Sequence, residues 1–150
     1  MKLTERDIKM EKVVIKKMNG DIIFSYISKN NSMCKTILKY IEICKKRERI
    51  ADFRGVDFSH ADFSNADFSY ANFSYANFIG ANFTNADFSN TNFIGANFTN
   101  TDFSNADFSN TDFRWVNFTN VDFSDTDFSW VNFSNANFND TINFSMNRIH

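Results

Sequence analysis

The chain has 150 residues, a formal net charge of −2, no proline, four glycines and 20 phenylalanines. This length fits one domain, and the composition excludes a flexible linker or a collagen-like chain. No apolar run reaches the ~18 residues of a membrane span. The charged start from Met1 to Arg6 does not have the pattern of a signal peptide, so we expect a cytoplasmic protein.

Charge divides the chain into two parts. Residues 1–50 hold 13 Lys or Arg against six Asp or Glu, which gives +7. Residues 51–150 hold three Arg against 12 Asp and no Glu, which gives −9. The molecule is therefore polarised, with a basic head and an acidic body, and this polarity bears on association rather than on fold.

The first fifty residues predict a small basic ββα unit. Two β-rich runs, at 11–17 and 21–28, flank Asn19-Gly20, and Asn-Gly is the dipeptide most typical of a tight hairpin. A hairpin alone is marginal in water. We therefore expect its apolar side to pack against the helix that follows.

Ser32 is a suitable N-cap for a helix from about Met33 to Arg47. Its apolar face comprises Cys34, Ile37, Leu38, Ile41 and Cys44, and its charged face comprises Lys35, Lys39, Glu42, Lys45 and Lys46. The two cysteines are separated by ~15 Å along such a helix, too far for a disulfide. The lysine-rich face, which points away from the apolar one, is a solvated surface or, as an alternative, a nucleic-acid-binding surface.

The ninety residues from Ala51 to Asp140 form 18 blocks of five with no break in register. Each block reads small residue, Asp or Asn, Phe, mostly Ser or Thr, and a variable residue. A phenylalanine at every fifth position fits neither the 3.6-residue period of a helix nor the two-residue period of a flat strand. The predicted core consists of the central residues: Phe53, Phe58, Phe63, Phe68, Phe73, Phe78, Phe83, Phe88, Phe93, Phe98, Phe103, Phe108, Phe113, Phe118, Phe123, Phe128, Phe133 and Phe138.

This run, for example Ala61-Asp62-Phe63-Ser64-Asn65, resembles the pentapeptide-repeat family, whose blocks read A(D/N)LxX or A(D/N)FxX. The resemblance implies an all-β solenoid, a right-handed quadrilateral β-helix with four blocks per coil and hence about 4.5 coils. The central residue and the small residue two positions before it then point inward. We expect the head (1–50) to close one end of the β-helix (51–140) and the apolar tail (141–150) to close the other.

With four blocks per coil, residues 20 apart stack on one side of the solenoid. On two neighbouring sides the residue before Phe is Asp at seven of eight positions. One of these sides carries Asp67, Asp87, Asp107 and Asp127. Stacked exposed carboxylates ~5 Å apart repel by ~1 kcal/mol or less per pair. Alternatively, Asp and Asn both hydrogen-bond to local backbone here, which makes their exchange nearly neutral.

The last position of the block carries the large aromatic residues Tyr70, Tyr75, Trp115 and Trp130, on two adjacent sides. Exposed Tyr, Trp and Arg are enriched in binding hot spots. The ladder from Asp67 to Asp127 shares a side with Tyr70 and Trp130. We predict that side as the interaction face.

No catalytic or metal-binding pattern is present. His60 and His150 belong to no triad or metal-ligand spacing, and there is no glycine-rich phosphate loop. We therefore expect no enzymatic activity, no cofactor and no metal.

The first functional hypothesis is a non-catalytic scaffold that binds an unidentified protein and no membrane. The resemblance implies a second, because some pentapeptide-repeat proteins mimic duplex DNA and bind DNA gyrase or topoisomerase IV. This chain departs from those in being short, uninterrupted and acidic on only about half its circumference. The third is direct nucleic-acid binding by the basic head, which the acidic body opposes. The order of head and repeats also resembles small phage-encoded pentapeptide proteins.

Overall fold

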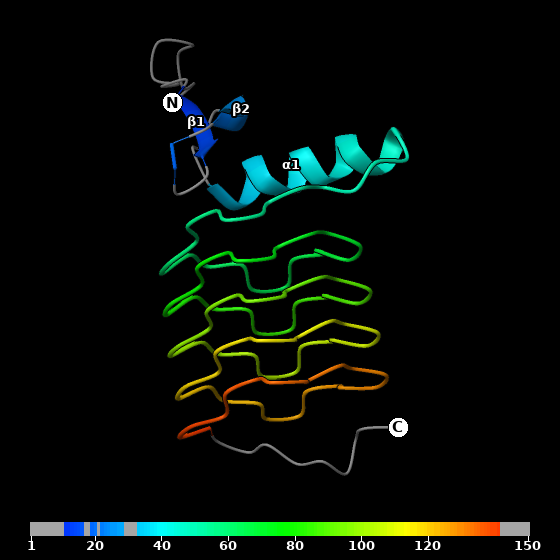
Figure 1. The fold of residues 1–150 in the computed structure, drawn as a ribbon. Helices are drawn as coiled ribbons and strands as arrows, with labels where there is room; N and C mark the ends of the chain where they lie inside the picture. The colour runs from blue at the N-terminus through cyan, green and yellow to red at the C-terminus, as the bar shows by residue number, and fades with distance from the viewer. Residues whose placement is uncertain (1–10, 17–18, 21, 29–32, 142–150) are drawn as a thin grey trace, which may run out of the picture.

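The computed structural model describes residues 11–16, 19–20, 22–28 and 33–141. It contains a hairpin, one helix and a stack of coils (Figure 1). The elements in chain order are β1 (Glu11–Lys16), β2 (Ile22–Ser28) and α1 (Met33–Lys46), followed by the solenoid. The predicted N-cap Ser32 and the predicted closing tail lie outside the described residues.

The hairpin and the helix lie where the sequence predicts them, to within one residue at each end. β1 and β2 pair antiparallel, with Glu11 opposite Ser28, and α1 packs against both strands. Ile15 of β1 is buried and joins Ile37 and Ile41 of α1 in one apolar cluster. No helix within the described ranges is long and apolar enough to cross a membrane.

α1 ends in a Schellman motif built without glycine. The Arg49 N–H donates to the Cys44 carbonyl at 3.0 Å, and the Glu48 N–H donates to the Lys45 carbonyl at 3.2 Å. Glu48 takes the left-handed conformation, with φ of 53°. This turn ends the helix and leads the chain into the first coil at Ala51.

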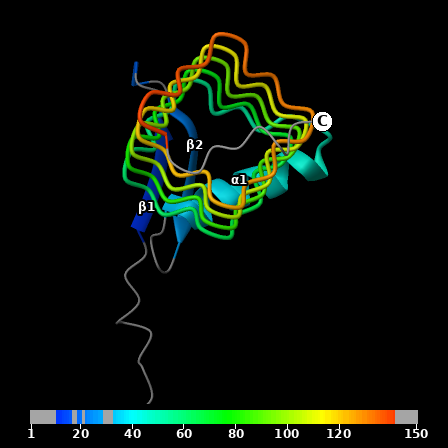
Figure 2. The ribbon, with the colours of Figure 1, turned by 90° about the horizontal axis from the view of Figure 1, so that it is seen from below.

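The solenoid is held together by parallel β-bridges between residues 20 apart, from Asp52–Asn72 to Asn117–Asn137. Backbone bonds join the coils at each side, such as the Phe53 N–H to the Asn72 carbonyl at 2.8 Å. Viewed along the axis, the coils superimpose on one four-cornered outline (Figure 2). The expected solenoid is thus confirmed, and its right-handed sense and total coil count stay predictions.

We number the four sides by the blocks that form them. Side I comprises 51–55, 71–75, 91–95, 111–115 and 131–135; side II comprises 56–60, 76–80, 96–100, 116–120 and 136–140; side III comprises 61–65, 81–85, 101–105 and 121–125; side IV comprises 66–70, 86–90, 106–110 and 126–130.

Phenylalanine rings fill the interior in four columns. Rings 20 residues apart stack with centroids 4.9–6.0 Å apart and planes within 21° of parallel. Successive rings within a coil meet edge to face, such as Phe78 and Phe83 at 5.2 Å and 72°. The rings from Phe53 to Phe128 are at most 2% exposed, whereas Phe133 and Phe138 in the last coil are partly exposed.

The first position of each block stays small because it lies beside these rings. Where it is threonine, the buried hydroxyl donates to a carbonyl of the preceding coil, as from Thr101 Oγ1 to Phe78 O at 3.0 Å. Thr91, Thr111 and Thr126 make equivalent bonds. The polar group is therefore satisfied, and threonine is tolerated in a dry interior.

α1 lies against the first coil. The ring of Tyr40 meets that of Phe53 edge-on, with centroids 5.2 Å apart. Lys45 Nζ contacts the Asp67 carboxylate at 2.8 Å and Ser69 Oγ at 3.0 Å. Lys45 is exposed, as its place on the charged face predicts, and its long side chain reaches a carboxylate of the first coil.

Candidate interaction surface

The last residue of every block lies in a turn between two sides. The N–H of the next block donates to the Phe carbonyl, as from Ala76 to Phe73 at 3.0 Å. In all 18 blocks the last residue has a φ between 52° and 68°. Such a turn favours Gly, Asn or Asp. Thirteen of the 18 residues at this position are Asn, Gly or Asp, so the backbone conformation restricts which residues the last position of the block accepts.

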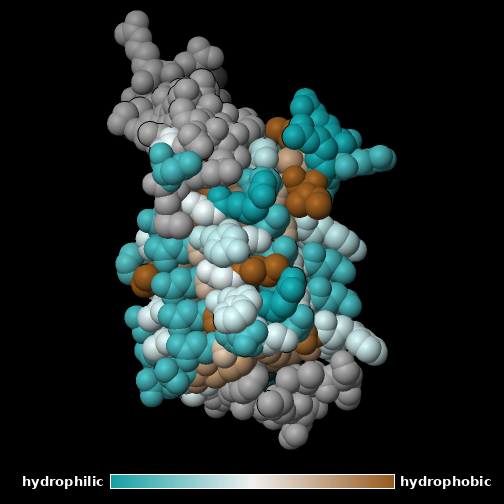
Figure 3. Space-filling model, in the orientation of Figure 1, coloured by the Kyte–Doolittle hydropathy of each residue, from teal (hydrophilic) through white to brown (hydrophobic). Residues whose placement is uncertain are grey.

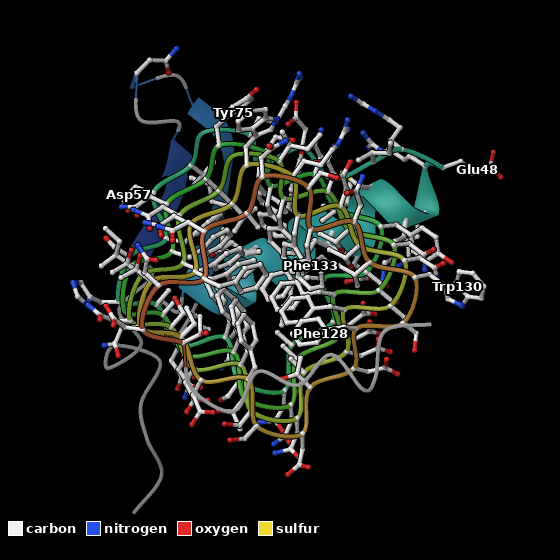
Figure 4. All side chains as sticks on the ribbon, turned by 60° about the horizontal axis from the view of Figure 1, so that its bottom comes forward. Glu48, Asp57, Tyr75, Phe128, Trp130 and Phe133 are labelled. Atoms are coloured by element: carbon white, nitrogen blue, oxygen red, sulfur yellow. The ribbon has the colours of Figure 1, made fainter. Side chains whose placement is uncertain are left out.

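Four of the five exceptions are the large aromatic residues Tyr70, Tyr75, Trp115 and Trp130. Their side chains are 63–70% exposed. A bulky residue in the left-handed region costs about 1–2 kcal/mol relative to its ordinary conformation. Figure 4 shows Tyr75 and Trp130 pointing outward from two corners, while Phe128 and Phe133 point into the interior. The four exposed rings therefore oppose the local backbone preference without the burial that would offset it.

The four aromatic residues surround one side of the solenoid. Tyr70 and Trp130 lie at the corner between sides IV and I, and Tyr75 and Trp115 lie at the corner between sides I and II. Side IV, the predicted interaction face, is bordered by only two of them. The structure thus places all four around side I, with the ladder that begins at Asp67 around the corner.

Two arginines of side I are each paired with the Asp of their own block. Arg54 donates from Nε to Asp52 Oδ1 at 2.9 Å and from Nη2 to Asp52 Oδ2 at 2.8 Å. Arg114 makes the same bidentate pair with Asp112. The carboxylates raise the pKa of both guanidinium groups further. Side I therefore displays planar cations whose charge is balanced within the same side.

The ring of Tyr75 lies over Gly95 in the next coil. A Cβ built on Gly95 would be 2.7 Å from both Cδ1 and Cε1 of that ring. A Cβ on Gly55, in the same column, would meet no atom within 4 Å. Gly95 thus provides the space that the Tyr75 ring occupies.

The Asp and Asn residues before Phe all perform the same local task. In every block the Oδ1 atom accepts the N–H two residues on, as from Ser89 to Asp87 at 2.8 Å and from Ser74 to Asn72 at 3.0 Å. This bond does not distinguish Asp from Asn, as the neutral-exchange alternative requires. The choice between Asp and Asn does change the charge of each side: the net charges of sides I, II, III and IV are 0, −2, −4 and −4.

Asp67 differs from the other carboxylates of its ladder because it joins the head to the solenoid. Partial burial raises its pKa, but the bonds from Lys45 and Ser69 outweigh this and leave the pKa below its usual value. Asp87, Asp107 and Asp127 follow it along side IV. Asp67 is therefore a structural contact, and the other three carry the acidic surface of this side.

A hollow of about 440 Å³ lies between the end of α1 and the first coil. Its lining includes Cys44, Arg49, Ile50 and Tyr70, and Cys44 is a buried free thiol. Across the visible face, apolar residues form separate brown spots among teal and pale atoms (Figure 3). Within the described ranges, no group of three His, Cys, Asp or Glu residues is placed to hold a metal ion.

Comparison with known proteins agrees with this architecture. A search of curated proteins finds no match. A trypsin-treated variant of QnrB1, a plasmid-mediated fluoroquinolone resistance protein, aligns at 26% identity over 57% of this chain and 44% of that one, with a TM-score of 0.54. HetL from the cyanobacterium Nostoc sp. strain PCC 7120, a pentapeptide repeat protein involved in heterocyst differentiation regulation, aligns at 18% identity over 61% and 48%, with a TM-score of 0.48. The chain spans less than half the length of these two structures.

The family model for pentapeptide repeats matches residues 51–85, 81–120 and 103–140. Together these ranges cover all 18 blocks of the solenoid, which is more than half of the chain. The protein belongs to the pentapeptide repeat family.

Proposed function

We propose that the protein is a non-catalytic interaction module that binds a protein partner through side I and the aromatic residues of its two corners. The observation that supports this most strongly is the position of Tyr70, Tyr75, Trp115 and Trp130 in turns that disfavour them. Exposed rings at strained positions contribute little to folding. Their composition, together with Arg54 and Arg114, is that of binding hot spots.

The geometry of side I also reduces the entropic cost of association. Tyr75 is positioned over Gly95, and Arg54 and Arg114 are each fixed by a bidentate carboxylate. Side chains that are ordered before binding lose less freedom when the partner arrives. A side without net charge, on which one ring and two guanidinium groups have neighbours that position them, therefore suits contact with another protein surface.

Affinity capture tests this proposal. We would compare the wild type, Trp115→Asn/Trp130→Asn and a control, Asn90→Gly/Asn110→Gly, which changes the corner between sides IV and I without touching a ring. Lysate from the organism that encodes the chain supplies candidate partners, identified by mass spectrometry and then purified. We expect at least one protein to bind both the wild type and the control but not the Trp115→Asn/Trp130→Asn variant. Identical binding to all three proteins would overturn the proposal.

A second candidate function is binding to a type II topoisomerase as a mimic of duplex DNA. Sides III and IV hold eight Asp over four coils. At ~4.8 Å per coil this is about one carboxylate per 2.4 Å of axis, against one phosphate per ~1.7 Å in DNA. The likeness to the quinolone-resistance protein QnrB1 favours the same candidate.

A gyrase supercoiling assay tests the second candidate. Inhibition, or protection from a quinolone, should decrease in the variant Asp87→Asn/Asp107→Asn, which keeps both Oδ1 acceptors and removes two charges. No effect of wild-type protein at micromolar concentration would exclude this function.

The third hypothesis, nucleic-acid binding by the head, is weakened by the contacts of three of the ten lysines in residues 1–50. Lys45 pairs with Asp67 at 2.8 Å, and Lys39 and Lys46 pair with Glu42 at 2.8 and 2.6 Å. These carboxylates compete with phosphate for the same cations. A salt titration of DNA binding that shows no affinity even at low salt would remove this hypothesis.

A further inference from the structure

We propose that the partner of side I is a second copy of this chain, bound face to face and antiparallel across a two-fold axis that passes beside Gly95. This inference rests on the proposed function, because it takes side I as a protein-binding surface. Three features of the described residues support it: the charge of the four sides, the order of residues along the two aromatic corners, and the position of the Tyr75 ring over Gly95.

Charge favours side I over every other side for contact between identical solenoids. Side I carries no net charge, because Asp52 and Asp112 are paired with Arg54 and Arg114. Two copies that met through side III or side IV would bring eight carboxylates together, with repulsion of up to ~1 kcal/mol for each close pair in water. Contact through side I instead leaves the acidic sides away from the interface.

At both corners of side I the large aromatic residues are placed symmetrically along the axis, with a Tyr towards one end and a Trp at the matching position towards the other. The corner between sides I and II reads Gly55, Tyr75, Gly95, Trp115 and Asn135, and the corner between sides IV and I reads Tyr70, Asn90, Asn110 and Trp130. A two-fold axis lying in the interface sets each column against itself in reverse order. Tyr75 then faces Trp115 of the second copy, and Tyr70 faces Trp130 of the second copy.

A single two-fold axis can relate both corners of the two copies, because the centres of the two columns lie at nearly the same level along the solenoid axis. The first column is centred on Gly95, and the second is centred midway between Asn90 and Asn110, at the level of the following block. One block advances the chain by a quarter of a coil, or about 1.2 Å along the axis. Both columns are therefore matched at almost the same register between the two copies.

The centre of this interface is occupied by the Tyr75 ring. Gly95 has no side chain, and the Tyr75 ring lies over it. The two Tyr75 rings of a dimer would meet near the axis, each beside Trp115 of the other copy. Arg114 lies in the same block as Trp115, so its guanidinium would reach the level of the opposite tyrosine and add a cation–π contact.

Side I is small, which sets the strength of the dimer. Five coils and five residues give a surface of about 24 Å by 16 Å. Two such surfaces bury less than the ~1,200–2,000 Å² of a stable complex. We expect a reversible dimer with a dissociation constant of about 10–100 µM.

Sedimentation velocity of the full chain between about 5 and 500 µM is the test. The wild type should change from monomer to dimer over this range. Trp115→Ala removes one ring from each copy, and hence two rings from the dimer interface. It should raise the dissociation constant at least ~100-fold. Ile94→Glu places a charge at the centre of side I and should prevent dimers, whereas Ile79→Glu, at the equivalent position of side II, should not.

Two glycine variants test the role of the Tyr75 ring without altering any ring. In Gly95→Asn the new residue still tolerates the left-handed turn, but its side chain displaces the Tyr75 ring. The dissociation constant of the dimer should therefore rise ~10-fold or more. Gly55→Asn is the matched control, because it has the same backbone and open space around its Cβ, and should change the dissociation constant less than ~2-fold.

A wild type that remains monomeric at 500 µM, or a dimer that Ile79→Glu breaks and Ile94→Glu does not, would overturn the inference. Its failure is distinct from failure of the proposed function. If the wild type is monomeric but captures a protein that Trp115→Asn/Trp130→Asn does not, side I binds a different partner. If the wild type dimerises through side I and captures nothing, the second copy is the partner.

Discussion

Aromatic rings occupy two contrasting regions of this protein. The central Phe of each block lies in a column of stacked rings, and those from Phe53 to Phe128 are almost wholly buried. Tyr70, Tyr75, Trp115 and Trp130 instead lie in left-handed turns and are more than 60% exposed. The interior rings are required by packing, whereas the corner rings oppose the backbone preference of their positions. The same class of side chain thus serves folding in one region and, in our proposal, binding in the other.

The largest effect is expected inside. Phe103 is fully buried and stacks on Phe83 at 5.4 Å and on Phe123 at 6.0 Å. Phe103→Ala should lower the free energy of unfolding by about 3–5 kcal/mol, because it leaves a cavity between two coils. Phe138→Ala, in the partly exposed last coil, is the matched control and should lose less. A loss below ~1 kcal/mol at Phe103, measured by urea unfolding, would mean that the rings do not form a packed interior.

The junction between head and solenoid should show a smaller, pH-dependent effect. The pKa values of Asp57 and Asp67 are lowered in the folded state, for Asp57 mainly by the N–H of Ser59. Lowered carboxylate pKa values stabilise the fold above the unfolded value of ~3.9, and this stabilisation is lost as the pH falls through the folded values. Thermal melts from pH 7 to pH 2 should show this loss.

In Lys45→Ala the ion pair with Asp67 is absent. The free energy of unfolding at pH 7 should fall by about 1 kcal/mol or less, since both side chains of this pair are partly exposed. Its pH dependence should also be shallower than that of the wild type. An unchanged acid profile would contradict the assigned role of Asp67.

The acidic side should respond more weakly and in the opposite direction. Asp87→Asn/Asp107→Asn keeps the Oδ1 acceptors for Ser89 and Ser109 and removes two neighbouring charges. Stability should rise by about 0.5–1 kcal/mol at low salt, and the gain should shrink as salt is added. A loss of stability, measured by urea unfolding at both salt concentrations, would show that these carboxylates do more than accept a local bond.

The repeat predicts the interior well because one rule repeats in every block. Phe every fifth residue, with a small residue two positions before it, is enough to specify stacked rings 20 residues apart. The recurrence of Asn and Gly at the last position of the block also indicates the left-handed turn. By that pattern Trp115 and Trp130 are exceptions to a backbone rule and not merely large variable residues.

Other features depend on geometry that no periodicity carries. The contact of Lys45 with Asp67 depends on the angle at which α1 crosses the first coil. The position of Tyr75 over Gly95 depends on a side-chain rotamer as well as on stacking. The arrangement of all four aromatic residues around side I, and not around the predicted side IV, depends on the last residue being in a turn.

In our proposal the corner rings are present for binding and not for folding. The free energy of unfolding of Trp115→Asn tests this, measured by urea at a protein concentration of about 1 µM, where the proposed dimer is dissociated. Because Asn suits the left-handed turn better than Trp, we predict a stability equal to that of the wild type or higher by about 0.5 kcal/mol. A loss of more than ~1 kcal/mol would show that Trp115 supports the fold and is not there for binding alone.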